Sequence, residues 1–559
     1  MTHTKDGRNR SLRQAAGFLL KGIGLVAAAA ALGILLLTAV FLWPVNEESF
    51  QKSYALWEEE GWYPDSLNMG EEYDVNANFH SFLPGILDNH TDMIMLSTAT
   101  RAVTGSPLRA AMEAYSGYLN DTYVRYWHGY VVILRPLLLF LDYGQLRVVN
   151  GVVQVLLALC LAVLLWRRAG RVGENRWLLL AALFTSLFLL APSALWRGLQ
   201  YSWVYGTALL TAIVLVWRAD RLKEGGKYLY VFLAAGIGTS FLDLLTYPLF
   251  TWSFPLVWFL LLSGEEISWK KSVCRVAASG LSWLLGYGGM WAAKWGMASL
   301  ILKQNVAATA MENVAVRSGT ADGMGLAERF EAIYRNWKHY TWLPYAIILC
   351  VWLAAFGYAA LRGRLAGNQK LPALFLVMSA GFVWCFVLAD HTMTHHFFAY
   401  RSFNGCILAF CAIVASSCRQ TAEERTPGRL KRTVLCTFFV VLAAAALTLT
   451  AREDLVAING QCEFTELALA DGGQLRMRFT PTFSKINSVG FGVRNNGADG
   501  VFTICVSDGE KPLYEEELSL SAFGEMVYVS VPVAWRLRHG HSYVLELGAQ
   551  YEGEDIGVL

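Results

Sequence analysis

The run AAGFLLKGIGLVAAAAALGILLLTAVFLW, residues 15–43, decides the class of fold to which this chain belongs. It is almost wholly apolar, and as a helix it is long enough to cross the hydrocarbon core of a bilayer. A signal peptide would have a shorter apolar core followed by a small-residue cleavage site, and no convincing site follows this run. Residues 1–43 are therefore predicted to form an uncleaved N-terminal transmembrane helix.

The composition of the whole chain agrees with a membrane protein. Of its 559 residues, 55% are hydrophobic and only 16% are charged, and the mean hydropathy is +0.37. A soluble protein of this length would be more polar. The ten cysteines are scattered, without a CxxC pair or a zinc spacing. Cys462 and Cys505 could pair if the polar tail that holds them is extracytoplasmic.

Apolar runs recur after a long polar stretch, residues 44–144, which is predicted to be an extracytoplasmic loop with interfacial helices. At ~20 residues per span, they predict about eleven transmembrane helices, counting the first. The bundle is predicted to occupy residues 145–450, with an outer loop at 303–340. The later runs are Gln145–Trp166, Trp177–Leu195, Leu199–Trp217, Tyr228–Leu245, Phe250–Leu262, Cys274–Leu300, Thr341–Leu361, Leu371–Ala389, Phe403–Ser417 and Thr433–Thr450.

Basic residues indicate which side of the membrane each connection faces. If the N-terminus is cytoplasmic, every connection assigned to the cytoplasm carries lysines and arginines, as in Arg167-Arg168 and Lys270-Lys271. The positive-inside rule therefore supports the span count and the orientation together. We predict a multi-pass plasma-membrane protein in contact with membrane lipids, with its C-terminal domain outside the cytoplasm.

The tail after the last span changes character. Residues 455–559 contain about seven short alternating runs separated by turn sequences such as Asn495-Asn496-Gly497 and Asp508-Gly509. This pattern favours a small antiparallel β-sandwich. The tail shows no nucleophile–base pair and no metal spacing, so we interpret it as a stabilising or recognition module.

The first outer loop contains a pair of acids, Asp88 and Asp92, shortly after Pro84-Gly85. Proline and glycine suit a helix start, and residues four apart share one face of a helix. Two adjacent carboxylates can bind a divalent metal, or one of them can act as a general base. A solvated helix face with capping acids is the alternative. No clear metal motif is present, so the cofactor is unknown and no metal ligand is assigned.

A second candidate site is the sequence LADHTMTHHFFAYR, residues 388–401, at the end of an apolar run. Ionisable groups are costly at the end of a membrane helix, so His391, His395, His396 and Arg401 are candidates for substrate binding. His391 and His395 have the spacing of a zinc-protease pair, but the glutamate of the H-E-x-x-H motif is absent. Arg401 suits an anion, because a guanidinium binds phosphate oxygens in a forked geometry. The alternative is a cluster that anchors the helix end at the headgroups.

Three further charges lie in or beside predicted spans. Asp243 and Lys294 fall late in their spans, toward the outer leaflet, where they should face a cavity or each other. They form either a salt bridge or a site in which Lys294 binds a phosphate and Asp243 accepts hydrogen bonds. Arg135 lies in a short apolar run, Val131–Leu141, that suits an interfacial helix. It either binds a lipid phosphate or extends to the interface without a role.

The architecture resembles the GT-C superfamily of membrane glycosyltransferases. The resemblance rests on the N-terminal span, the acidic first outer loop, the bundle of further spans and the extracytoplasmic C-terminal domain. It implies a catalytic Asp or Glu in the first outer loop, which we assign to Asp88 or Asp92, with Asp65 and Asp74 behind them. Many members carry this acidic motif directly after the first span, whereas Asp88 lies well beyond it.

The resemblance implies an inverting transfer of a sugar from a polyprenyl-phosphate donor to a cell-envelope glycan or lipid acceptor. Arg401, His391, His395 and Lys294 would then bind the phosphate. A flippase for lipid-linked sugars and a non-catalytic role in envelope assembly are the alternatives. A transporter would need buried charges near the bilayer midplane, whereas these gather at the outer end. The chain contains no Walker A, no GxGxxG after a strand and no GxSxG motif, and no nucleic-acid partner is expected.

Overall fold

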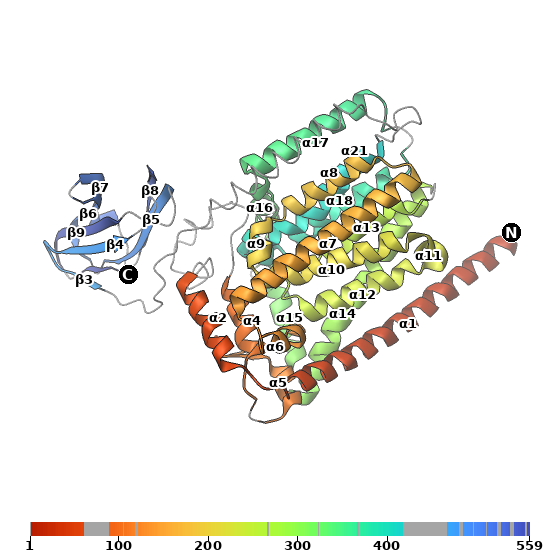
Figure 1. Ribbon diagram of the computed structural model, residues 1–559, viewed down its shortest axis with the longest axis horizontal. Helices are drawn as coiled ribbons and strands as arrows, with labels where there is room; N and C mark the ends of the chain where they lie inside the picture. Colours follow the sequence, from red (N-terminus) through yellow and green to blue (C-terminus); the bar gives the residue numbers. More distant parts are fainter. Residues whose placement is uncertain are drawn as a thin grey trace. The chain divides into compact units, whose positions relative to one another are not determined.

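The computed structural model describes residues 2–60, 89–103, 105–117, 121–264, 268–321, 323–365, 368–417, 467–479, 485–495, 497–509, 511–522, 527–536, 542–553 and 556–558. The chain forms two compact units (Figure 1). The first contains nearly all of the helices, and the second contains the strands β3 to β10.

A helix lies over every predicted span except Thr433–Thr450, which falls outside the described residues. These helices are α1 (Thr2–Val40), α7 (Tyr143–Val172), α8 (Arg176–Phe188), α10 (Leu199–Trp217), α12 (Tyr228–Leu242), α13 (Phe250–Leu262), α14 (Trp269–Leu302), α17 (Leu343–Leu361), α18 (Leu371–Val387) and α21 (Asn404–Ser417).

Within the described residues, five stretches are both long and apolar enough to cross a membrane: Ala15–Val40, α7, α10, α17 and His396–Ser417. The helices α8, α12, α13 and α18 are apolar but shorter. The chain is therefore mostly helical and has the character of a membrane protein.

Shorter helices connect the long ones. They are α2 (Glu47–Glu60), α4 (Asn89–Ala99), α5 (Pro107–Glu113), α6 (Val131–Leu137), α9 (Pro192–Arg197), α11 (Ala219–Lys223), α15 (Val306–Arg317), α16 (Leu326–Lys338), α19 (Ala389–Thr394) and α20 (His396–Ala399). Figure 1 shows α4, α5, α6 and α15 at one end of the bundle and α11 at the other. We call the first the loop-rich end. The second, where α7 and α13 end and α14 and α18 begin, we call the basic end.

The helix α13 lies at the centre of the bundle. All thirteen of its residues are buried, and it packs against α7, α10, α12, α14, α18 and α21. A helix that is apolar on every side belongs in such a position.

The helices α12 and α14 cross with their backbones in contact. A Cβ atom added at Gly236 would lie 2.2 Å from the Trp283 carbonyl oxygen, and one at Gly286 would lie 2.3 Å from the Leu233 carbonyl oxygen. Small residues of this kind allow membrane helices to approach closely. Asp243 follows directly after the end of α12.

The span predicted over Trp177–Leu195 is broken into α8 and α9. Ala191 has a positive φ of 56°, and Pro192 begins α9 without an N–H group that could bond to the Phe188 carbonyl. The Tyr345 hydroxyl donates to that carbonyl instead, at 3.2 Å. The break leaves other carbonyls at the end of α8 that need donors.

The second unit contains two antiparallel four-stranded sheets, ordered β3-β10-β5-β8 and β4-β9-β6-β7. Buried side chains from both sheets, including Val493, Ile556, Phe502 and Leu547, form one hydrophobic cluster. The seven predicted runs coincide with β3 to β9, and β10 was not predicted. Cys462 lies outside the described residues. The strands are β3 (Leu467–Leu469), β4 (Gln474–Phe479), β5 (Lys485–Arg494), β6 (Asp499–Asp508), β7 (Lys511–Ser519), β8 (Val527–Arg536), β9 (Tyr543–Glu552) and β10 (Ile556–Val558).

Candidate functional site

Asp92 holds the N-terminus of α10. Its side chain is fully buried. One carboxylate oxygen accepts from the Leu199 amide and the Tyr143 hydroxyl, both at 2.7 Å, and the other accepts from the Gln200 amide at 2.9 Å. An anion is stabilised at a helix N-terminus by the unsatisfied amides and the helix dipole. Burial raises the pKa of Asp92 to about 6. Asp88, Asp65 and Asp74 lie outside the described residues.

Two of the predicted phosphate-binding cations bind the C-terminal ends of helices. The Arg135 guanidinium donates to the carbonyls of Ala99 and Arg101 at 2.9 and 2.8 Å, after α4, and to Trp43 at 2.8 Å, after α1. Lys294 is fully buried, and its Nζ donates to the Met112 carbonyl of α5 at 3.0 Å. Neither forms an ion pair among the described residues. Helix C-termini attract cations because their last carbonyls lack partners.

Arg401 performs the same role at the break after α8. It is fully buried, and its Nε donates to the Leu190 carbonyl at 2.9 Å. Its guanidinium carbon lies 4.3 Å from the centroid of the Tyr201 ring and 4.8 Å from that of Tyr400. Cation–π contacts of this kind partly replace the missing counter-ion. This geometry favours a helix-capping role for Arg401 over phosphate binding.

Asp243 and Lys294 do not form the salt bridge that was one of the two predictions for them. Asp243 accepts from the Thr246 amide at 3.1 and 3.2 Å and from the Thr246 hydroxyl at 2.5 Å, which closes a turn after α12. Asp243 is therefore a buried acid that holds its own turn rather than the partner of Lys294.

His391 lies at the centre of a polar cluster at the loop-rich end. Its Nε2 lies 2.9 Å from the Leu245 carbonyl oxygen, and its Nδ1 lies 2.7 Å from Arg317 NH1. The carbonyl can only accept and the guanidinium can only donate, so the imidazole is neutral with its proton on Nε2. Burial, reinforced by His395 and Arg317, holds the pKa of His391 well below its usual range.

His395 lies beside His391, with 5.0 Å between their ring centroids, and it stacks on Phe398. Its buried Nδ1 has no hydrogen-bond partner among the described residues. Burial lowers the pKa of His395 to about 3, with Arg317 as the next cause. His396 belongs to another contact, in which its Nδ1 lies 2.9 Å from Nε2 of His339.

The structure thus brings His391, His395 and Arg317 together, and His391 bonds the carbonyl of Leu245, two residues after Asp243. We call Arg317, His391 and His395 the Arg317 cluster. Arg317 ends α15, is half-buried, and forms no ion pair among the described residues. Asp92, Lys294, Arg135 and Arg401 bind helix ends instead.

No motif in the sequence predicts a role for Arg317. One signal could have marked it: it is a basic residue in the predicted outer loop, residues 303–340, where the positive-inside rule expects few.

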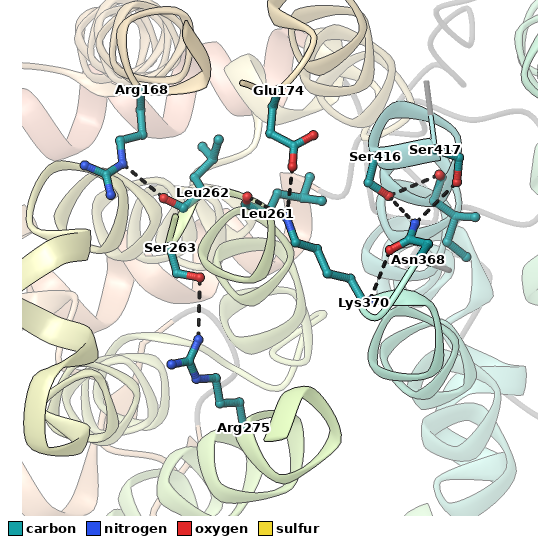
Figure 2. A network of polar contacts seen from close by, with 11 residues as sticks. Arg168, Glu174, Leu261, Leu262, Ser263, Arg275, Asn368, Lys370, Ser416 and Ser417 are labelled. Atoms are coloured by element: carbon teal, nitrogen blue, oxygen red, sulfur yellow. Dashed lines mark hydrogen bonds and ion pairs between the residues drawn. The ribbon is translucent and has the colours of Figure 1, made fainter. Parts of the chain in front are cut away.

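The opposite, basic end of the bundle has a second polar network (Figure 2). The last carbonyls of α13 accept hydrogen bonds there, Leu261 from Lys370 Nζ and Leu262 from Arg168 Nε, both at 3.0 Å. Lys370 also pairs with Glu174 at 2.9 Å. Arg168 pairs with Asp220, and this contact lowers the pKa of Asp220 to about 2. The network caps the central helix.

In the strand unit, a groove of about 700 Å³ lies on the sheet β4-β9-β6-β7. Arg476, Arg478, Glu515 and Glu546 line it with charges of both signs, and Arg476 pairs with Glu546 at 2.7 Å. Across the described part of the chain, no group of three or more His, Cys, Asp or Glu side chains is placed to hold a metal ion.

Comparisons with protein families, with curated proteins and with solved structures found no match to this chain. The site is therefore interpreted from its geometry.

Proposed function

We propose that this protein is a membrane glycosyltransferase of the GT-C type, which transfers a sugar from a polyprenyl-phosphate donor to a cell-envelope glycan or lipid. The reaction takes place on the outer face of the plasma membrane. The proposal includes about eleven spans, a cytoplasmic N-terminus and an extracytoplasmic β-sandwich at residues 455–559.

The observation that carries the proposal is the Arg317–His391 pair. A half-buried guanidinium without a carboxylate partner among the described residues is suited to an external anion. Neutral His391 accepts one N–H of Arg317 and fixes the orientation of the guanidinium without cancelling its charge. The pair lies beside α19, between the ends of two apolar helices, α18 and α21. The phosphate of a lipid-linked sugar donor would lie at the same depth, among the lipid headgroups.

In the proposed reaction, a hydroxyl oxygen of the acceptor attacks the anomeric carbon of the donor sugar. The bond between that carbon and the phosphate oxygen breaks, and its electron pair leaves with the phosphate. Arg317 stabilises the developing negative charge. Asp88 takes the proton of the hydroxyl. Asp92 is less suited to this step, because its oxygens already accept from three donors.

Replacement of Arg317 by glutamine is expected to weaken the binding of a polyprenyl phosphate by about 10- to 100-fold. This range corresponds to the loss of one charge-assisted contact, about 1.5–3 kcal/mol. The dissociation constant would be measured on purified protein in lipid nanodiscs. The matched control is Arg335→Gln, which removes an arginine that pairs with Glu331 on α16. Absence of binding by the wild type, or equal binding by Arg317→Gln, would contradict the proposal.

The step of transfer is tested separately, with a polyprenyl-phosphate sugar and a glycan acceptor. Asp88→Asn should still bind polyprenyl phosphate but should no longer release it from the donor. Full release by Asp88→Asn would remove Asp88 from the mechanism. Binding without release by the wild type, across a panel of donors, would favour a flippase or an assembly role over a transferase.

A further inference from the structure

The helix α16 (Leu326–Lys338) has an exposed apolar stripe. Leu326, Phe330 and Tyr334 are 67%, 61% and 54% exposed, and Trp337 is 37% exposed. The first three follow one another at intervals of four residues and Trp337 comes three residues later, so all four lie on one side of the helix.

The two other sides of α16 differ from this stripe. Ala332 and Asn336 are buried against the bundle. Glu328 is exposed on a third side, where the half-buried Glu331 and Arg335 pair at 2.9 Å. The helix therefore has one side against the protein, one apolar exposed side and one charged exposed side. A helix in which an apolar and a charged side are both exposed is typical of a boundary between lipid and water.

Contacts of α16 place it across the ends of apolar helices. Near its start, Arg329 donates to the Phe386 carbonyl in the last turn of α18 at 2.8 Å. Near its end, the Trp337 ring lies 6.2 Å from Phe382 of α18. The next long apolar helix, α17, begins at Leu343, only a few residues after α16 ends. Both ends of α16 therefore lie at the level where spans begin or end.

We propose that α16 lies in the outer membrane–water interface, with its apolar stripe buried among phospholipid headgroups and upper acyl chains. Thirteen residues give a helix of about 20 Å, which is too short to cross a bilayer. Aromatic side chains such as Phe330, Tyr334 and Trp337 are enriched at this depth. Lys338 Nζ, 6.0 Å from the Tyr334 ring centroid, lies where a basic group can meet lipid phosphates.

The helix α16 also contacts the segment that holds the Arg317 cluster. On the buried side of α16, Asn336 Nδ2 donates to the Thr392 carbonyl at 2.6 Å, next to His391. The interfacial helix therefore holds α19, and with it the Arg317–His391 pair, at headgroup depth. This inference does not depend on sugar transfer.

The test places the photoreactive residue p-benzoylphenylalanine at position 330 or 334, where an aromatic ring replaces an exposed aromatic ring. The matched control places it at Glu328, which is exposed on the charged side of the same helix. Each protein is reconstituted into vesicles of phosphatidylethanolamine and phosphatidylglycerol with radiolabelled acyl chains, and is then irradiated. Lipid adducts should form at positions 330 and 334 at ten or more times the level at 328.

Equal labelling at the three positions would overturn the inference. Adducts with a second copy of this chain at 330 and 334, in place of lipid, would also overturn it and would identify the stripe as an interface between copies. Because plain phospholipid is the probe, failure of this experiment leaves the proposed transferase activity to be judged by its own assays.

Discussion

Alanine in place of Gly286 should strongly destabilise the helical unit. The added methyl group would lie 2.3 Å from the Leu233 carbonyl oxygen, a backbone atom that cannot turn aside. The helices α12 and α14 would have to separate along their crossing, and overpacking of this kind costs about 1–3 kcal/mol or more. We expect a lower midpoint of thermal unfolding in detergent and a smaller monodisperse fraction in size-exclusion chromatography.

The matched control is Gly288→Ala, two residues along the same helix. A Cβ atom at Gly288 meets no atom within 4 Å, and alanine favours a helix over glycine by up to about 1 kcal/mol. This variant should be neutral or slightly more stable. Equal behaviour of the two variants would show that the close crossing of α12 and α14 is not required for folding.

Replacement of Asp92 by alanine should produce a second large loss of stability. The buried N-terminus of α10 would lose the acceptor of its first two amides, and the Tyr143 hydroxyl would lose a partner. Each buried donor that loses its acceptor costs about 1–3 kcal/mol, so the total should reach several kcal/mol. The thermal midpoint in detergent would be compared with that of wild type. An unchanged midpoint would mean that α10 does not need this cap.

The variant Asp92→Asn removes the charge of Asp92 but keeps the shape of its side chain and one acceptor oxygen. Burial raises the pKa of the folded carboxyl to about 6, above its ordinary value of 3.8. The folded chain thus holds this proton more tightly than the unfolded chain does. Lowering the pH from 7 to 4 should therefore stabilise wild type relative to Asp92→Asn, which does not titrate. A difference in stability between wild type and Asp92→Asn that does not vary with pH would contradict the raised pKa of Asp92.

The sequence predicted the positions of the long helices well, because each helix coincides with a long apolar run, and such a run is unfavourable in water. It overestimated the length of α8, since hydropathy does not register that Pro192 and the left-handed Ala191 end a helix. The alternation of apolar and polar residues, together with the turn sequences, located β3 to β9. The three-residue strand β10 was not predicted.

The site was harder to predict. Arg135, Lys294 and Arg401 were singled out as charges that are costly in a membrane, and all three are buried. What such a charge binds cannot be derived from residue types when the partner is a backbone carbonyl. Every residue carries that group, so no pattern marks the helix end that a cation will meet. The pairing of Arg317 with His391 joins residues 74 apart in the chain, and only the packing of α15 on α19 reveals it.

Three of the buried cations, unlike Arg168, also bear on the order in which this chain can enter a bilayer during synthesis. Lys294 binds a carbonyl of α5, Lys370 binds one of α13, and Arg401 binds one that follows α8. In each case the residue with the accepting carbonyl precedes the cation in the chain. The helix end that accepts the hydrogen bond is therefore synthesised before the charged segment leaves the ribosome. A charge that is expensive in lipid can then be inserted beside its acceptor. A circular permutant that reversed this order would present the same charges to the bilayer with no acceptor in place.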